Sequence, residues 1–300
     1  MKKVAIYIFL TAFLFGTMEV ALKLAGSNMD AFQLTFLRFI IGGLLLLPFA
    51  IKEIKKNDTK LEIKDYGYLL YLGTLCIPVS MLLFQFGVMH SNASTASVLI
   101  SANPLFTIIF AHFMANEYFN KDKLIVLIFG LLGILFMVRP WSLQEGNTPF
   151  GIIMMIMAAI TFGLYTVAGK ISVKKIGIMV QTSISFILGS LVLLIIMLFM
   201  GKPIIAGVAE HYLMVLYIGI FVTGMGYYFY FAAIKNSDAT TGSIAFFIKP
   251  AIAPVIAVIF LGDKILWNTY VGIILILIAS YLNIRNKKRE EALKHNENLV

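Results

Sequence analysis

The chain consists of long apolar runs separated by short polar segments. A helix that crosses the hydrocarbon layer of a membrane needs about 20 mostly apolar residues. Ten runs approach or exceed this length: 4–26, 32–51, 66–89, 93–115, 124–140, 149–170, 178–200, 212–234, 239–262 and 267–284. The pattern therefore predicts an all-α integral membrane protein with ten transmembrane helices.

Composition supports this interpretation and excludes a soluble class. Hydrophobic residues make up 60% of the 300 residues and charged residues only 13%, whereas soluble domains are about 25% charged. The net charge of +9 lies mostly in short loops, so it is a topology signal and predicts no nucleic-acid partner. One cysteine, Cys76, excludes an intrachain disulfide. We expect no cofactor, no metal and no catalytic residue.

The basic residues predict the orientation of the chain. With both termini in the cytoplasm, 18 Lys and Arg residues fall in cytoplasmic segments and three fall outside. The other three lie within the apolar runs. Because cytoplasmic loops are enriched in Lys and Arg, both termini are expected in the cytoplasm of a protein of the plasma or inner membrane.

The sequence contains a weak internal repeat. A shift of 146 residues aligns 65–139 with 211–285 without a gap, and near the start the shift is 147. The matches include Tyr66 with Tyr212, Gly73 with Gly219 and Pro104 with Pro250. We predict a first repeat over 1–142, a second over 147–286 and a charged cytoplasmic tail over 287–300. Because each repeat has five spans, the two must have inverted topology, as in many secondary transporters.

Particular motifs recur in both repeats. "FGTMEVALK" (15–23) matches "FGLYTVAGK" (162–170), and "STASVLISANPLFTIIFAHFMANE" (94–117) matches "TTGSIAFFIKPAIAPVIAVIFLGD" (240–263). With "QLTFLRFIIGGLLLLP" (33–48), these resemble the drug/metabolite transporter superfamily, specifically its ten-helix EamA-type carriers. The resemblance implies a secondary transporter. Glu19 departs from the uncharged residue that the family often has at this position.

Among the charged residues inside the predicted spans, three are candidate functional residues: Glu19, Arg38 and Lys249. A charge at the centre of a spanning helix costs about 2.5 to 3.5 kcal/mol, so it is usually paired or functional. Glu19 and Arg38 fall at about the same depth in the first two spans, and we expect them to pair. The pair is either a fixed clamp between two helices or part of a substrate site.

Lys249 lies near the centre of the ninth span, and Asn103 holds the matching position in the first repeat. Ala245, Ala253 and Ala257 lie at four-residue steps from Lys249 and therefore on the same helix face. Small residues mark a face that packs closely against other helices, which predicts that Lys249 points into protein or a cavity. Lys249 is expected to meet an anionic substrate group or to titrate during transport. The alternative is a structural lysine bonded to carbonyls that Pro250 and Pro254 leave free.

Tyr227 and Tyr230 are candidate cavity residues, because a hydroxyl gives a polar contact in an apolar wall. The alternative for each is packing or contact with lipid. Together the candidates predict a transporter that works by alternating access around a midplane cavity. Export of amino acids or related amphipathic or anionic compounds is implied by the resemblance. Proton coupling, and a monomer or a homodimer, remain open.

Two other functions compete with this one. An intramembrane enzyme would need a convergent catalytic set, and Glu19 is the one acidic residue deep in any predicted span. A channel would typically have rings of polar groups from assembled copies around a pore. A chain with its own twofold architecture favours a carrier.

Overall fold

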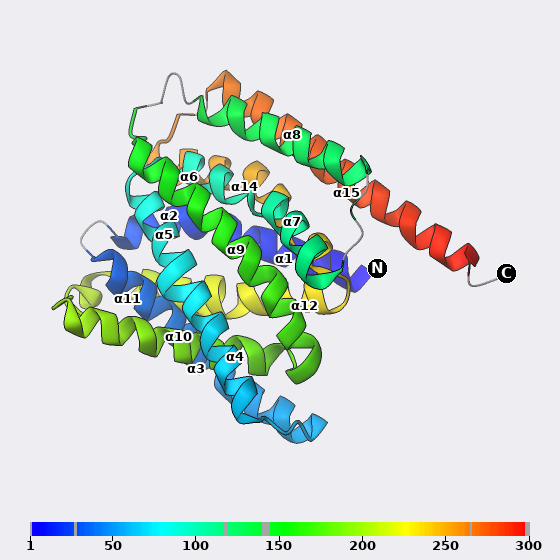
Figure 1. The fold of residues 1–300 in the computed structure, drawn as a ribbon. Coiled ribbons are helices and arrows are strands. Elements are labelled where there is room, and N and C mark those ends of the chain that lie inside the picture. Colours follow the sequence, from blue (N-terminus) through cyan, green and yellow to red (C-terminus); the bar gives the residue numbers. More distant parts are fainter. Residues whose placement is uncertain are drawn as a thin grey trace.

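The computed structural model describes residues 2–26, 29–116, 119, 121–139, 145–264 and 266–297, and all regular structure in these ranges is helical (Figure 1). The first half contains α1 (Lys2–Gly16), α2 (Met18–Gly26), α3 (Ala31–Asn57), α4 (Ile63–Thr74), the π-helix η1 (Leu75–Met81), α5 (Leu82–Met89), α6 (Ala93–Ile100), α7 (Asn103–Ala115) and α8 (Lys121–Val138). The second half contains α9 (Pro149–Ile176), α10 (Ile178–Phe199), α11 (Val208–Tyr217), the π-helix η2 (Ile218–Met225), α12 (Gly226–Lys235), α13 (Ala239–Gly242), α14 (Ile244–Leu261) and α15 (Trp267–Glu297).

Eight helical segments of the described chain are long and apolar enough to cross a membrane: Lys3–Ala25, Ala31–Asn57, Ile63–Met89, Ala93–Ala115, Pro149–Ile176, Ile178–Phe199, Val208–Lys235 and Ala239–Leu261. The prediction of an all-helical membrane protein is thereby confirmed. The remaining two predicted spans correspond to α8 and α15. Helix α8 carries three charged residues in its first turn, and α15 has an apolar part over Trp267–Ala279.

Side chains at the loop ends set several helix boundaries. Asp30 accepts a hydrogen bond from the Phe32 backbone N–H at 2.9 Å, and Thr148 accepts one from Gly151 at 3.0 Å. Each satisfies an amide that has no partner inside its helix. Between α9 and α10, Gly177 has φ 98°, a left-handed conformation that glycine adopts without steric cost. The chain turns there within one residue.

Several spans are interrupted midway. The first breaks at Thr17 between α1 and α2, and the fourth breaks between α6 and α7 just before Asn103. Pro78 lies in η1, and η2 interrupts the corresponding part of the span over Val208–Lys235. Such π-helical turns often occur at functional sites. Glu19 and Asn103 each lie in the first turn after a break.

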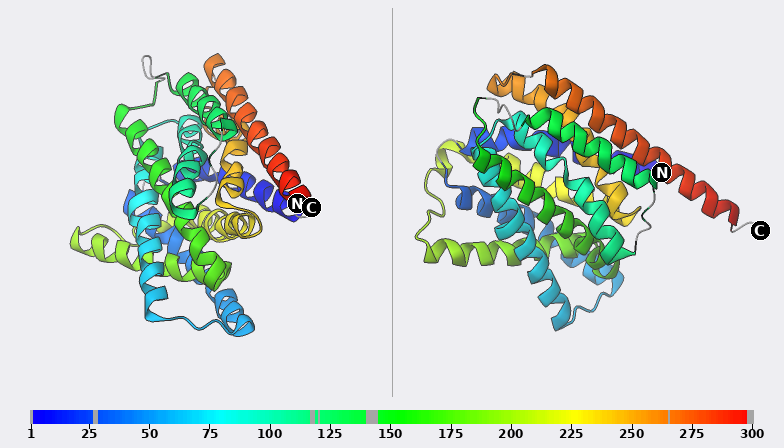
Figure 2. Two further views of the ribbon diagram at one scale, coloured as in Figure 1. Left: turned by 45° about the vertical axis from the view of Figure 1, so that its right-hand side comes forward. Right: turned by 45° about the horizontal axis from the view of Figure 1, so that its top comes forward.

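Two glycine contacts bring helices from the two halves close together. A Cβ on Gly42 in α3 would lie 3.1 Å from the Gly219 carbonyl oxygen in η2. Gly73 in α4 lies directly against Gly189 in α10, backbone to backbone. Helix α3 also packs along α10, and α9 packs along α7 and α5. At one edge of the bundle, α8 lies alongside α15, and the C-terminal part of α15 extends beyond it (Figure 2).

We predict that Gly73→Ala destabilises the protein by about 1 to 3 kcal/mol, because the added methyl group overlaps the α10 backbone. Gly67→Ala is the matched control, since it lies in the same helix with nothing within 4 Å of the added carbon. Thermal unfolding of the detergent-solubilised variants measures the difference. Equal stability of the two variants would contradict the packing described here.

Candidate functional site

A buried ion pair joins the helical segments over Lys3–Ala25 and Ala239–Leu261. The Lys249 ammonium on α14 donates a hydrogen bond to Glu19 Oε1 on α2, and the two side chains are 0% and 1% exposed. Their helices pack against each other. The three alanines on the face of Lys249 are also buried, so its predicted inward orientation is confirmed. The second carboxylate oxygen, Glu19 Oε2, has no hydrogen-bond partner within the described chain.

Arg38 lies on α3, is completely buried and does not pair with Glu19. Its Nη1 donates to the Met18 Sδ at 3.4 Å, and its guanidinium carbon lies 4.6 Å from the centre of the Phe39 ring. Nε and Nη2 have no hydrogen-bond partner among the described residues. The predicted Glu19–Arg38 pair is therefore wrong: α14 packs against α2 and brings Lys249 to the carboxylate instead.

Aromatic rings form a common wall for the two cations. The Phe84 ring centre is 5.9 Å from the Arg38 guanidinium carbon and 5.7 Å from Lys249 Nζ. Phe246 lies 5.9 Å from the same Nζ. The faces of aromatic rings attract cations, and the attraction increases when water is excluded. Glu19, Arg38 and Lys249 are here called the charged cluster.

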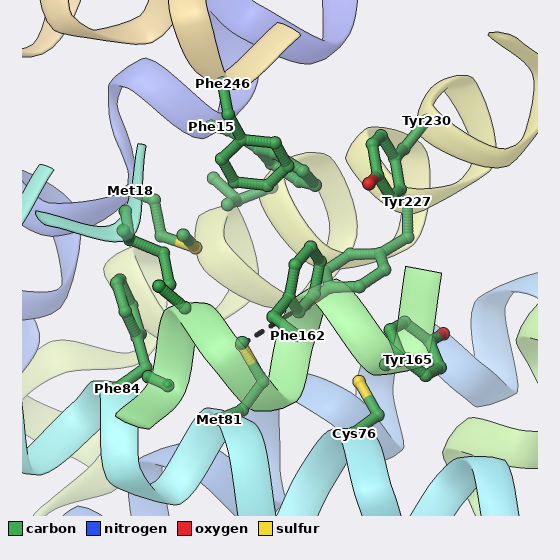
Figure 3. Packing of buried hydrophobic residues seen from close by; sticks show 14 of the residues in the cluster. Phe15, Met18, Cys76, Met81, Phe84, Phe162, Tyr165, Tyr227, Tyr230 and Phe246 are labelled. Atoms are coloured by element: carbon green, nitrogen blue, oxygen red, sulfur yellow. Dashed lines mark hydrogen bonds between the residues drawn. The ribbon is translucent and has the colours of Figure 1, made fainter. Parts of the chain in front are cut away.

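A small cavity of about 10 Å³ lies beside the charged cluster, with room for about one water molecule. Its wall includes Met18, which also contacts Arg38, and Phe246, which also faces Lys249. Figure 3 shows these side chains converging from different helices. The complete lining is Phe15, Met18, Met81, Ile100, Phe162, Tyr227 and Phe246.

The structure separates the two candidate tyrosines. Tyr227 lines the cavity and donates a hydrogen bond to the Met81 Sδ at 3.2 Å (Figure 3). Tyr230 is buried behind it, and its hydroxyl lies 2.7 Å from Thr166 Oγ1. Neither side chain faces lipid, because both are at most 1% exposed.

Asn103 is buried at the start of α7. Its Oδ1 accepts a hydrogen bond from Thr107 Oγ1 at 3.0 Å, whereas its Nδ2 has no partner in the described part of the chain. Lys249 bonds to Glu19 rather than to this amide. The two positions that the repeat relates thus have different polar environments.

Six of the seven cavity residues form three pairs at the sequence offsets of 146 or 147. The pairs are Phe15 with Phe162, Met81 with Tyr227, and Ile100 with Phe246. The charged cluster does not follow this pairing. At the same offsets from Glu19, Arg38 and Lys249 the chain has Thr166, Ser185 and Asn103, which are buried but uncharged.

Sequence reasoning missed most of the cavity wall, in particular Phe15, Met18, Phe162 and Phe246, and it also missed Phe84 beside the two cations. The signal was present in part, because Phe15 and Phe162 open the two "FG" motifs that the repeat aligns. Apolar side chains in an apolar helix give no indication of which face they occupy. Within the described ranges, no group of three or more His, Cys, Asp or Glu residues could hold a metal ion.

The apolar helices and the buried charged cluster define a multi-pass membrane protein with a polar site in its interior. The EamA-like transporter family matches the chain over residues 2–139 and again over 149–285. The chain belongs to this family and is a transporter, not an enzyme.

Relatives match the chain along nearly its whole length. A protein of Clostridium kluyveri named as an uncharacterized transporter is 38% identical, with 98% of this chain and 97% of the relative covered. The S-adenosylmethionine uptake transporter of Rickettsia prowazekii is 25% identical, with 92% and 90% covered. One solved crystal structure has the same fold, with a TM-score of 0.73, 16% identity and 97% and 99% of the two chains covered.

We predict that Lys249→Met alone destabilises the protein by about 3 to 5 kcal/mol, because it leaves Glu19 as an uncompensated buried charge. The double variant Glu19→Gln/Lys249→Met removes both charges and recovers most of that loss. Thermal unfolding of the two single variants and the double variant measures the coupling. Additive effects of the two substitutions would contradict a direct interaction.

Proposed function

We propose that the protein is a secondary active transporter that moves small metabolites by alternating access around the charged cluster and its cavity. The observation that carries this proposal is the complete burial of Glu19, Arg38 and Lys249 inside membrane-crossing helices. Charged groups in that environment are costly, and they commonly mark substrate or ion pathways. A clamp that only holds helices together needs the ion pair but not Arg38.

The charges favour a substrate with a negatively charged group. In their ionised forms the three side chains leave one surplus positive charge in an apolar surrounding, which a carboxylate neutralises. The aromatic and methionine wall of the cavity suits an apolar part of the same molecule. We therefore propose amino acids or related amphipathic or anionic compounds as the substrate class.

Export is the proposed direction, as the sequence resemblance implies. The Rickettsia prowazekii relative is named for uptake of S-adenosylmethionine, a molecule that itself carries an amino-acid group. The direction therefore has to be measured with substrate on either side of the membrane. Proton coupling is the proposed energy source to test first, because Glu19 and Lys249 are titratable groups inside the site.

We further propose ten spans in two inverted repeats, 1–142 and 147–286, with α8 and α15 as the fifth and tenth spans. The two separate family matches support this division. The pairs of cavity residues support it as well. The two glycine contacts, Gly42 with Gly219 and Gly73 with Gly189, also support it, because the repeat offset relates one contact to the other. One chain supplies both halves, so we propose the monomer as the transporting unit, alone or within a homodimer.

Alternating access follows from this arrangement as a rocking of one half against the other. The cavity residues come from both halves, so a substrate held between them is exposed to one side at a time. In the structure the cavity is too small for a metabolite, as expected for a closed state between the two open ones.

We predict that the double variant Glu19→Gln/Lys249→Gln folds and inserts but loses at least about tenfold in transport, since it removes the charges without leaving one unpaired. The assay is counterflow in proteoliposomes with amino acids and organic acids, with and without a pH gradient. Lys55→Gln on the exposed end of α3 is the control and keeps wild-type rates. Wild-type transport by the double variant would refute the role of the pair, and single-channel currents would favour a channel.

We also propose that both termini lie in the cytoplasm, and this orientation can be tested by labelling. With Cys76, which is buried, replaced by serine, Ile205→Cys should react with a membrane-impermeant maleimide on intact cells. Asn57→Cys should react only after the cells are opened, because its loop is proposed to be cytoplasmic. The reverse labelling pattern would place both termini of the plasma-membrane protein outside.

A further inference from the structure

Arg38 has the most unusual environment in the charged cluster. A buried guanidinium normally forms paired hydrogen bonds with a carboxylate or phosphate. Here its one hydrogen-bond partner is the Met18 thioether, which is a weak acceptor, and two of its donor groups have none within the described chain. Unpaired donors in a dry interior are costly. The planar fork of Arg38 therefore has two donor groups whose geometry suits a carboxylate.

Glu19 has an acceptor atom that complements the donors of Arg38. Oε1 accepts from Lys249, while Oε2 is buried with no donor among the described residues. Arg38 and Glu19 are close enough to interact electrostatically but are not hydrogen-bonded. Both residues lie next to Met18. Glu19 follows Met18 in the chain, and Arg38 donates a hydrogen bond to the Met18 Sδ. Two free donors and one free acceptor therefore lie near the same cavity wall.

On these grounds, and resting on the proposed function, we propose that the charged cluster binds a carboxylate that has a hydrogen-bond donor on the adjacent carbon, as in a 2-amino or 2-hydroxy acid. Nε and Nη2 of Arg38 donate to the carboxylate, and Glu19 Oε2 accepts from the adjacent ammonium or hydroxyl group. The apolar remainder of the substrate enters the cavity beside Phe15, Phe162 and Phe246.

In this assignment the two basic residues of the charged cluster have different roles. Lys249 remains hydrogen-bonded to Glu19 Oε1 and holds the Glu19 carboxylate in place, so Lys249 is a positioning residue. Arg38 is the residue that binds the substrate carboxylate. The carboxylate of the substrate offsets the positive charge of Arg38, whose Nε and Nη2 have no hydrogen-bond partner among the described residues. A plain carboxylic acid does this too, but it leaves Oε2 without a donor, so it binds more weakly.

The test uses four compounds with one side chain: leucine, 2-hydroxy-4-methylpentanoate, 4-methylpentanoate and leucinamide. Their affinities are measured by calorimetry on the purified full-length protein. Leucine or the 2-hydroxy acid should bind at least about tenfold more tightly than 4-methylpentanoate and leucinamide. Which of the two binds more tightly distinguishes an ammonium from a hydroxyl group at Oε2. Equal affinities for all four, or no binding of any, would overturn the proposal.

Two variants separate the contacts. Arg38→Lys keeps the charge but loses the fork, so it should weaken both 2-substituted acids by about tenfold or more and leave leucinamide unchanged. Glu19→Gln keeps an acceptor for Lys249 and places an amide N–H₂ at the position of Oε2. It should remove the advantage of leucine over 4-methylpentanoate without weakening the plain acid.

Lys55→Gln, an exposed substitution on the same helix as Arg38, is the control and should leave all four affinities unchanged. Thermal unfolding of each variant confirms folding, and the ratio of affinities is independent of the fraction that is folded. An unchanged ratio in Glu19→Gln, or unchanged affinities in Arg38→Lys, would refute the assigned contacts. If wild-type protein discriminates among the four compounds but shows no counterflow of any, the transport proposal fails while the binding site stands.

Discussion

The ion pair between Glu19 and Lys249 is the interaction on which the centre of this structure depends. Neither charge is tolerated alone in a dry interior, because removing an ion from water costs several kcal/mol and only a nearby opposite charge offsets it. The pair therefore requires α2 and α14 to lie together, although 230 residues separate its members. The break at Thr17 and the prolines after Lys249 shape the two helices at this contact.

The charged cluster lies beside the cavity and lacks the pairing that most of the cavity wall has. Aromatic and apolar residues at matching sequence offsets line the same cavity, whereas the charged residues have uncharged counterparts. Phe84, which borders both cations, has Tyr230 as its counterpart, and Tyr230 bonds to Thr166 rather than to a charge. The positions of the charged cluster are therefore ionic, and the positions one offset away are neutral.

Close backbone contacts surround this centre. Phe39 and Phe186, which are also one offset apart, stack edge to face with ring centres at 4.7 Å. Phe39 shares α3 with Gly42, which contacts η2, and Phe186 is on α10, which Gly73 contacts. Because glycine has no side chain, the helices approach to backbone distance at these crossings, and a methyl group would have no room there.

The sequence by itself determined the class of the protein. Run lengths predicted the helical spans, and the recurrence of polar loops, prolines and glycines indicated the family and the offsets that later matched across the cavity. It also located the buried charges, because Glu19, Arg38 and Lys249 stand out in apolar runs. These features are local or periodic, so they can be read without knowledge of packing.

The tertiary structure alone decided which charges meet. Depth along each helix made Glu19 and Arg38 reasonable partners, but depth does not specify which helix faces which, and the packing of α14 against α2 gave the carboxylate to Lys249. Arg38 was left with a thioether and unpaired donors. The cavity wall likewise depends on helix rotation, which a uniformly apolar helix does not encode, since lipid and protein interior are both apolar.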